Sequence, residues 1–403
     1  KIRRVCNGNK RVGGADMIER EHALLSASSA DKWLHCTPSA KMEELFPDKT
    51  SPAAEEGTLA HELAEIKVKL YFNQISKADY NNALKKIREN EIYSKDMDTY
   101  TDEYLEYIKD IEAILPGRPY VIVETKVDYS NYAPEGFGTI DCMMIYGDEL
   151  HIIDFKYGKT IEVNAVDNPQ LKLYALGAIN RYGMLYGIKK IGVHIVQLRM
   201  KNISSWQCTT DELLNWGDTT VKINADKAFN GVGDCVVGEW CDSHFCRARP
   251  RCRAYMERME ALKPYITTDP KILTNSEVGQ ALTLAANIKK WYSILEGYAQ
   301  SALLSGHEID GWKIVEGRSN RAFDSVDKAF SQAIQEGINE EMLYKRTPIT
   351  LTECEKMFGK KEFERVFGSH IIKPPGKPTI VKQDDPRPPF NPAAVDFKDF
   401  EVI

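Results

Sequence analysis

Two aspartates and one lysine have the chemistry and the spacing to hold a divalent cation and hydrolyse a phosphodiester. Asp141 lies in the run 138–146, and Asp154 and Lys156 end the run 150–156. Both runs are predicted strands of one hairpin, in which facing side chains lie about 5 Å apart and residues two apart share a face. Such carboxylates suit Mg²⁺ or Mn²⁺, and the lysine can orient water and neutralise phosphate charge. The alternative is an ordinary ion pair between Asp154 and Lys156 at the strand ends.

Three further polar residues stand where predicted helices bring them toward these carboxylates. His61 lies in a helix predicted over 53–72, and its imidazole can join the cation. A histidine there is also typical of a helix surface or core. Gln170 and Tyr174 are one turn apart in a helix predicted over 168–182, so both can reach the site.

Four of the nine cysteines have an arrangement that suits a metal group. Cys241, Cys246 and Cys252 follow the predicted sheet, and Cys36 precedes it. Four thiolates can ligate a [4Fe–4S] cluster and so join two distant segments. Zinc also accepts four cysteines, and unligated buried cysteines are the third interpretation.

The elements that must position these residues form an α/β pattern. After helices predicted over 53–72 and 100–115, the hydrophobic period changes from helical to extended. The predicted strands cover 120–127, 138–146, 150–156 and 191–198. The helix over 168–182 joins the third strand to the fourth, which predicts a central mixed sheet flanked by helices.

We expect four segments along the chain. Residues 1–16 are basic and aperiodic, as in a translated leader or disordered tail, and 17–260 hold the sheet and the late cysteines. Residues 261–372 include a helix predicted over 276–304 and form a helical, α+β accessory domain. The proline-rich segment 373–403 is expected to be extended or disordered.

The composition bears on membrane insertion, secretion and nucleic-acid binding. No run of eighteen apolar residues is present, which excludes a membrane-spanning helix. The N-terminus also has no apolar segment of the kind that marks a secretory signal. The odd cysteine count favours a reducing, cytoplasmic compartment. A net charge of −6 is unlike that of a general nucleic-acid binder, although cation-binding carboxylates are acidic by necessity. Basic residues nevertheless cluster locally, and the cluster is either a binding patch or a solvated helix face. It consists of Arg247, Arg249, Arg251, Arg253 and Arg258.

The order of these motifs resembles the RecB-type branch of the PD-(D/E)XK nucleases, over roughly residues 24–255. The matching motifs are His61, Gly138-Thr-Ile-Asp141, Ile152-Ile-Asp154-Phe-Lys156 and Gln170-x-x-x-Tyr174. The resemblance implies a restriction-endonuclease-like core with a helical C-terminal extension. It implies Asp141, Asp154 and His61 as metal ligands, Lys156 as catalytic, and Gln170 and Tyr174 as supporting residues. Glu124 in the first predicted strand is also similar to a glutamate often found there.

The cysteines resemble those of the iron–sulfur members of that branch, the AddB subunit and the CRISPR-associated spacer-acquisition nucleases. Those proteins pair one early cysteine with three late ones, which implies Cys36, Cys241, Cys246 and Cys252 as ligands of a [4Fe–4S] cluster. The gap of four residues after Cys241 departs from the usual two, and Cys235 is the nearest substitute.

These observations predict a Mg²⁺- or Mn²⁺-dependent deoxyribonuclease that hydrolyses DNA phosphodiesters through activated water. The full chain resembles an uncharacterised phage and prophage family found near replication genes. The resemblances imply an exonuclease or end-processing role in phage replication or recombination, in the host cytoplasm. Single-stranded DNA or duplex ends are the expected partners, with a single-stranded-DNA-binding protein as a further candidate. The alternative is a non-catalytic DNA-binding or scaffolding subunit of a replication complex.

Overall fold

The computed structural model describes residues 23–47, 51–258, 273–315, 325–344 and 350–371, together with Pro386. They divide into two units, Lys1–Ile314 and Val315–Ile403. The segments expected to be a leader and a proline-rich tail lie outside the described residues, apart from Pro386. Within the described ranges, no helix combines the length and apolar character that crossing a membrane requires.

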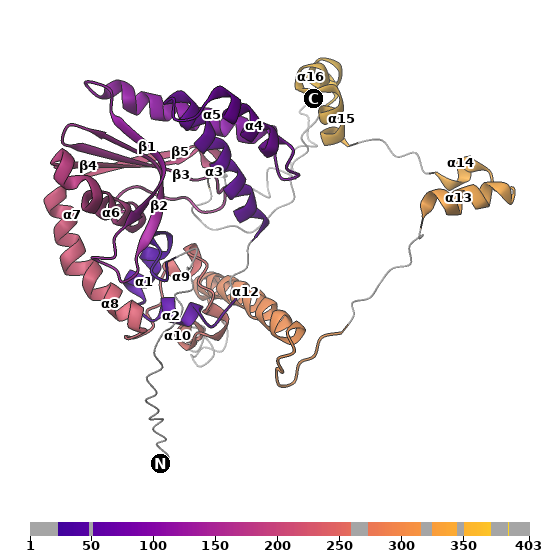
Figure 1. The fold of residues 1–403 in the computed structure, drawn as a ribbon. Coiled ribbons are helices and arrows are strands. Elements are labelled where there is room, and N and C mark those ends of the chain that lie inside the picture. Colours follow the sequence, from indigo (N-terminus) through magenta and orange to yellow (C-terminus); the bar gives the residue numbers. More distant parts are fainter. Residues whose placement is uncertain are drawn as a thin grey trace, which may run out of the picture. The chain divides into compact units, whose positions relative to one another are not determined.

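A five-stranded mixed sheet forms the centre of the first unit (Figure 1). Its strands, which are adjacent in chain order, are β1 (Tyr120–Asp128), β2 (Phe137–Tyr146), β3 (Glu149–Phe155), β4 (Lys190–Gln197) and β5 (Asn202–Thr209). The pair β3–β4 is parallel, and the other neighbouring pairs are antiparallel. The predicted α/β class with a mixed sheet and flanking helices is therefore confirmed, and each predicted strand matches an observed strand.

The fifth strand was missed by the sequence analysis. β5 pairs with β4 along its whole length, from Asn202 opposite Gln197 to Thr209 opposite Lys190. Its side chains alternate between half-buried and exposed, and it lacks a continuous β-branched run. Pairing with β4, rather than its own composition, therefore makes this segment a strand.

Helices cover both faces of the sheet (Figure 1). One face carries α3 (Pro52–Tyr71) and α5 (Lys95–Ile114), with α4 (Lys77–Arg88) packed on α3; the other carries α6 (Pro169–Tyr186), α7 (Thr210–Trp216) and α8 (Lys222–Asn230). In β3, Leu150 and Ile152 pack on the α6 side, while Ile153 and Phe155 pack on the α3 side. Strand alternation thus divides the core into two layers.

The start of α6 is fixed by local signals. The Asn168 side chain accepts hydrogen bonds from the backbone N–H groups of Gln170 and Leu171, and Pro169 occupies the first turn. Both features are typical of a helix N-terminus, and Gly187 ends the helix at a φ of 57°. Gln170 therefore lies in the first turn of the crossover helix, next to the carboxyl end of β3.

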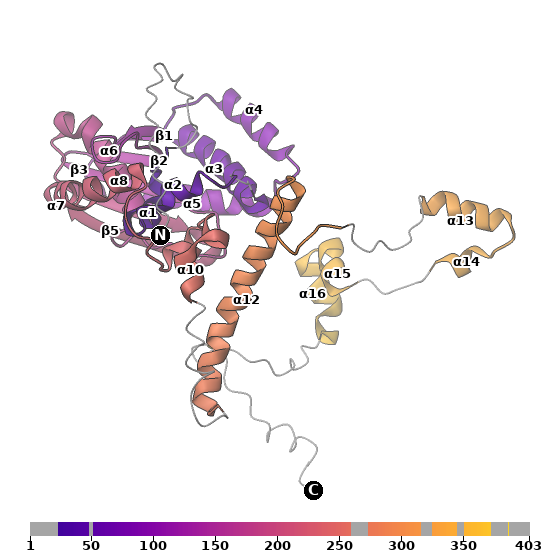
Figure 2. The same ribbon diagram turned by 90° about the horizontal axis from the view of Figure 1, so that it is seen from below.

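A single long helix, α12 (Asn275–Leu304), belongs to the first unit (Figure 2). It begins with a capping box between Thr274 and Glu277. The sequence analysis assigned this helix to the accessory segment. The second unit contains α13 (Val326–Gln335), α14 (Glu340–Leu343), α15 (Leu351–Phe358) and α16 (Lys360–Phe367).

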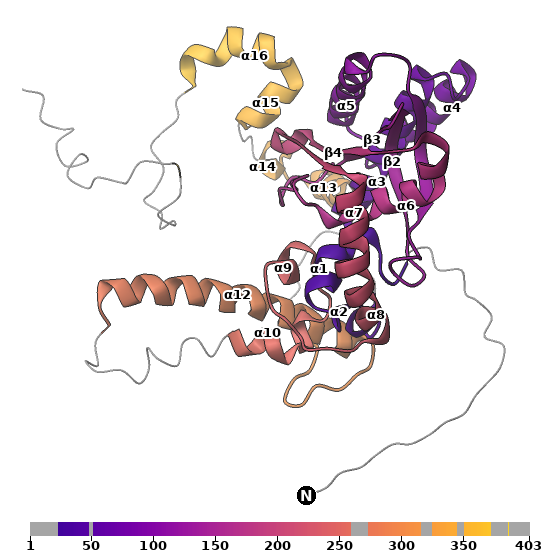
Figure 3. The same cartoon turned by 90° about the vertical axis from the view of Figure 1, so that its left-hand side faces the viewer.

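Residues before the sheet pack against residues after it. The early helices α1 (Ala30–His35) and α2 (Ser39–Glu43) lie beside α8, close to α9 (Trp240–Ser243) and α10 (Arg253–Glu257) (Figure 3). Glu43 forms a buried ion pair of 2.7 Å with Lys32 and accepts a 2.7 Å hydrogen bond from the backbone N–H of Arg247. The Thr37 hydroxyl donates to the Val232 carbonyl at 2.6 Å. The chain is thus closed around the sheet by polar contacts between distant segments.

Two buried histidines lie side by side where β3 and β4 pair. His194 Nε2 is 3.2 Å from His151 Nδ1, and the Tyr107 hydroxyl is 2.9 Å from His194 Nδ1. Burial and the neighbouring His151 lower the pKa of His194 from 6.5 to about 4. The fold therefore keeps this imidazole neutral at pH values where the unfolded chain would protonate it.

We expect the free energy of unfolding to fall as the pH drops from 6.5 toward 4, because only the unfolded chain then takes up this proton. The loss from His194 is on the order of 3 kcal/mol, at about 1.4 kcal/mol for each unit of pKa shift. Denaturant titrations across this range should show a shallower pH dependence for His194→Gln than for the wild type. The exposed control His307→Gln should keep the wild-type dependence, and an unchanged slope in His194→Gln would contradict the assignment.

Candidate metal centre

The β2–β3 hairpin opens where the carboxylates lie. Its ladder runs from Tyr146 opposite Glu149 to Cys142 opposite Ile153, and Asp141 comes next in β2. The backbone N–H of Phe155 donates to Asp141 Oδ2 at 2.7 Å. A side-chain carboxylate thus satisfies an N–H group that a strand carbonyl would otherwise satisfy, and this carboxylate is held between the two strands.

The first strand is irregular at the same level. Glu124 stands opposite Asp141 in the β1–β2 register, but these two residues form no ladder pair although the positions on both sides do. Glu124 has a φ of 51°, a left-handed conformation that is unfavourable for a residue with a Cβ. Such strain costs on the order of 1–3 kcal/mol and is concentrated at functional sites.

Both strands exchange faces at this point. In β2, Ile140 packs on the α6 side and Cys142 on the α3 side; in β1, Val123 packs on the α3 side and Val127 on the α6 side. Residues two or four apart in a regular strand share a face, so the alternation is broken within both strands. The break lets carboxylates from two adjacent strands turn toward α3.

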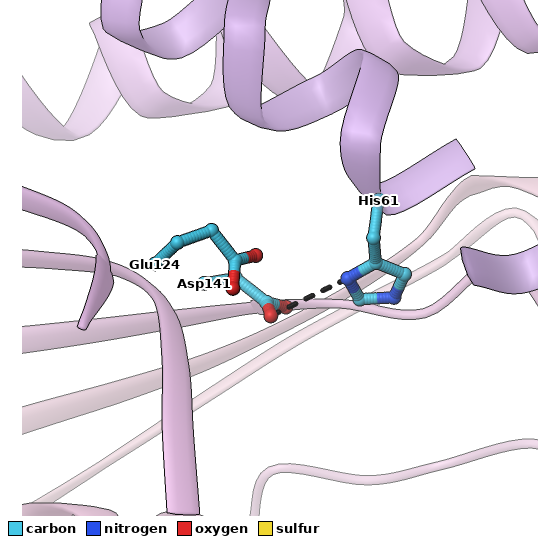
Figure 4. A group of neighbouring side chains, drawn as sticks. All are labelled: His61, Glu124 and Asp141. Atoms are coloured by element: carbon cyan, nitrogen blue, oxygen red, sulfur yellow. Dashed lines mark ion pairs between the residues drawn. The ribbon is translucent and has the colours of Figure 1, made fainter. Parts of the chain in front are cut away.

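His61, Glu124 and Asp141 form a compact group (Figure 4). One potential ligand atom from each lies within 4.8 Å of the others. His61 projects from α3 with Nδ1 3.3 Å from Asp141 Oδ1, and its ring packs against Phe155 with 5.3 Å between ring centroids. Two carboxylates and an imidazole are a donor set that Mg²⁺ or Mn²⁺ accepts.

The charges of this group are coupled. Burial and the Asp141 carboxylate raise the pKa of Glu124 to about 7. The pKa of Asp141 is lowered because His61, Lys156 and the Phe155 N–H outweigh the effect of its burial. The pKa of His61 is raised because Asp141 outweighs burial in the same way. Glu124 is therefore the group expected to release a proton when a cation binds.

Asp154 lies beside this group rather than within it. It forms a 3.0 Å ion pair with Lys156, whose ammonium also donates to Gln170 Oε1 at 3.1 Å. Gln170 Nε2 donates to Asp154 Oδ1 and to the Tyr174 hydroxyl, each at 3.1 Å. The structure thus brings together four of the predicted site residues. These are Asp154, Lys156, Gln170 and Tyr174, which form one hydrogen-bonded network. The role of Asp154 as a metal ligand stays a prediction.

Strand alternation explains this separation. Ile153 and Phe155 pack toward α3, so Asp154 and Lys156 project toward α6, where Gln170 begins the helix. Burial and Asp141 raise the pKa of Asp154, although Lys156 opposes them. The pKa of Lys156 is raised because Asp154 and Asp141 outweigh its burial. Lys156 therefore keeps its positive charge at neutral pH.

A glycine makes room for the phenol in this network. A Cβ added at Gly138 would lie 2.6 Å from the ring of Tyr174, well inside van der Waals contact. Gly138 opens the sequence motif that ends at Asp141, and close packing against Tyr174 accounts for it. β2 therefore supplies the carboxylate of Asp141 and, at Gly138, the space for the ring of Tyr174.

Sequence reasoning gave Glu124 less weight than the structure does. The residue was noted only through its resemblance, yet it contributes to the compact group in place of Asp154. A signal was present in the sequence, because a single carboxylate interrupts the apolar and β-branched run 120–127. What the sequence lacked was the left-handed backbone that turns this carboxylate toward α3.

The predicted cysteine ligands lie where the early and late segments meet. Cys36 ends α1, Cys241 lies in α9, and Cys252 precedes α10. Burial raises the pKa of Cys36, and the thiols of Cys241 and Cys252 raise it further. Burial, Cys252 and Cys36 likewise raise the pKa of Cys235 to about 11. Cys36 and Cys252 are therefore each close enough to affect the other three thiols electrostatically, the substitute Cys235 included.

Cys246 has different surroundings. Burial and the carboxylate of Glu43 raise its pKa to about 12, with a smaller contribution from Cys241. In the described part of the chain, the compact group of possible ligand atoms contains no cysteine. The ligand set Cys36, Cys241, Cys246 and Cys252 thus stays a prediction, with Cys235 as a fifth candidate.

Two comparisons with known proteins bear on this chain. The model of a family described as "Protein of unknown function (DUF2800)" matches residues 22–388. Among solved structures, the chain is similar to one titled "Crystal structure of SSO0001", at 12% sequence identity and a TM-score of 0.24. That similarity covers 54% of this chain and 95% of the other, and so low a TM-score supports no conclusion about a shared fold.

We expect Glu124→Gln to weaken Mn²⁺ binding at least about tenfold, as the loss of metal-site partners generally does. In the wild type, the affinity should also decline as the pH falls below about 7, because Glu124 must then lose a proton to bind the cation. Calorimetric titration at several pH values measures both effects, and the variant should show the weaker pH dependence. Glu149→Gln, at the opposite end of β3, is the matched control, and equal affinities for all three proteins would exclude Glu124 as a ligand.

Proposed function

Because this chain belongs to the DUF2800 family, whose description names no activity, we propose from its site that it is a metal-dependent DNA nuclease with a PD-(D/E)XK core. One observation carries the proposal. A compact group of His61, Glu124 and Asp141 adjoins a network in which Lys156 is held by Asp154 and Gln170. Oxygen-rich cation sites beside a fixed lysine suit hydrolysis of a phosphodiester.

The residues present fit a divalent cation. Glu124 and Asp141 are like charges close enough for Asp141 to raise the pKa of Glu124 to about 7, together with burial. A cation bound by these carboxylates and His61 would remove that repulsion. When bound, Mg²⁺ or Mn²⁺ would lower the pKa of a coordinated water and polarise the phosphoryl oxygen.

The side chains around this group have distinct tasks in the proposed reaction. Lys156 stays protonated, so it can donate hydrogen bonds to the attacked phosphate and oppose its growing negative charge. Asp154 and Gln170 fix the ammonium from two sides, and Tyr174 fixes the amide of Gln170 in turn. A charged donor held in place before substrate arrives needs little reorganisation during the reaction.

The same site favours DNA-end processing or exonuclease action in phage replication or recombination, as the resemblance implies. The alternative is a non-catalytic DNA-binding or scaffolding subunit. Cleavage of end-labelled single- and double-stranded DNA with Mg²⁺ or Mn²⁺, compared with EDTA, distinguishes the two. A protein that binds DNA but never cleaves it with either cation would support the alternative.

We further propose that Cys36, Cys241, Cys246 and Cys252 hold a [4Fe–4S] cluster, with zinc as the alternative. Support comes from the packing of Cys36 at the end of α1 against the segment that carries the late cysteines. The polar contacts of Glu43 and Thr37 join the same two segments. Thiolates ligating one cluster would add a second closure at this place.

We expect Lys156→Gln to lower the cleavage rate about 10²- to 10³-fold, as is typical for the loss of one group that stabilises transition-state charge. Thermal unfolding is measured alongside, because the variant leaves the buried Asp154 carboxylate without its ion-pair partner and lowers stability. The rate is measured with end-labelled DNA under single-turnover conditions. Lys159→Gln, an exposed charge three residues away, is the matched control. Wild-type rates in Lys156→Gln would refute its catalytic role.

We expect Cys36→Ser to bleach an otherwise brown protein and to lower its melting temperature. A cross-link that closes a loop of this length stabilises the fold by about 5 kcal/mol through the unfolded chain. Anaerobic preparation, visible absorption and iron analysis should give about four irons per chain in the wild type. Cys208→Ser, in β5, is the control that should keep both colour and stability. Colourless wild-type protein with one zinc would favour the zinc alternative instead.

A further inference from the structure

A second site-like feature lies between the arginine-rich segment and α12. A cavity of about 480 Å³ is bounded there by both segments of the first unit. Its lining includes Arg247, Arg249, Arg251 and His307, and no carboxylate is present among the described residues that line it. A cavity with cationic walls and no acidic residue concentrates anions. It differs in this respect from the protein as a whole, whose net charge is −6.

The basic character of this region is built into the packing. Asp242 lies within 4.0 Å of three cations: Arg249 at 2.8 Å, Lys290 at 3.4 Å and Arg258 at 4.0 Å. Arg249, Arg258 and Lys290 therefore share one carboxylate, while Arg247 lies 4.0 Å from the Glu43 carboxylate. Arg251 adds a further exposed charge at the cavity itself.

Aromatic rings stand beside these charges. Phe46 and Tyr298 contact each other edge-on across the cavity lining, at 6.0 Å between ring centroids. Phe245 is 61% exposed and has a φ of 45°, a left-handed conformation unfavourable for so bulky a residue. Backbone strain of this kind is concentrated at functional sites, so an exposed aromatic ring held there points to a ligand.

Phe245 belongs to the walls of two cavities. The second cavity, of about 720 Å³, is also lined by Lys32 and His244 and by the carboxylates Glu43 and Glu44, whereas no carboxylate is present among the described residues that line the first.

We infer that Phe245 and Arg251 form a binding subsite for an unpaired DNA strand. This inference rests on the proposed nuclease function and names the form of its substrate. Proteins that bind single strands combine a cationic groove for the phosphates with aromatic side chains on which bases stack. Paired bases in a duplex are already stacked on each other, so a lone ring such as Phe245 can take up only an unpaired base.

The test measures binding rather than cleavage. The wild type and its variants are titrated, in EDTA, against a labelled single strand and against the duplex of the same sequence. Phe245→Asn removes the ring but keeps a residue that tolerates positive φ, and Phe245→Tyr keeps the ring. We expect Phe245→Asn to weaken single-strand binding about tenfold, with Phe245→Tyr near the wild type. Duplex binding should be equal in all three proteins.

The charge is tested in the same assay. Arg251→Gln should lower the slope of log affinity against log salt concentration by about 0.7 for the single strand, as for one lost phosphate contact. Lys85→Gln, an exposed charge on α4, is the matched control and should leave the slope unchanged. Circular dichroism and visible absorption establish that the variants fold like the wild type.

Each other outcome counts against the inference. Single-strand binding unchanged in both Phe245→Asn and Arg251→Gln would overturn it, and so would equal losses on single strand and duplex. A wild type that fails to bind single-stranded DNA would overturn it as well. Cleavage is scored separately with Mg²⁺ or Mn²⁺. Absent cleavage with intact single-strand selectivity would refute the proposed nuclease, while normal cleavage without selectivity would refute only this subsite.

Discussion

The hydrogen bond from the Phe155 N–H to the Asp141 carboxylate is the interaction on which the site depends. It occurs where the β2–β3 ladder ends, so the N–H has no strand carbonyl to pair with. A buried N–H left without a partner costs about 1–3 kcal/mol, and Asp141 removes that cost while lying between the strands. The strained backbone of Glu124 occupies the same level of β1. Regular pairing on both sides of this point holds the irregularity in place.

Because the irregularity lies within the sheet, both helical layers can supply side chains to it. α3 provides His61 from one side, and α6 provides Gln170 and Tyr174 from the other. The charges follow the same division. The carboxylates of Glu124 and Asp141 lie with the His61 imidazole on the α3 side, and Lys156 is paired with Asp154 on the α6 side. In the proposed reaction, a cation and the protonated lysine would act on one phosphate without competing for the same ligands.

Closure of the chain around the sheet creates the remaining features. Glu43 and Thr37, near the beginning of the described chain, contact Arg247 and Val232 near the end of the sheet domain. The cysteines and the basic cavity both depend on this contact, since each draws residues from early and late segments. A protein with a net charge of −6 in this way presents a locally basic surface, which its overall charge does not reveal.

The sequence by itself determined the local elements and the residue types of the site. Periodicity gave four of the five strands and the crossover helix, because their apolar patterns reflect burial on the sheet. It also singled out Asp141, Asp154, Lys156 and their supporting residues through type and spacing. The tertiary structure decided which of them meet. Glu124, rather than Asp154, joins His61 and Asp141 because both strands exchange faces between Val123 and Val127 and between Ile140 and Cys142. β5 forms because β4 offers it an edge. A break in strand alternation and the pairing of an edge strand arise from contacts between segments, and a one-dimensional pattern does not encode them.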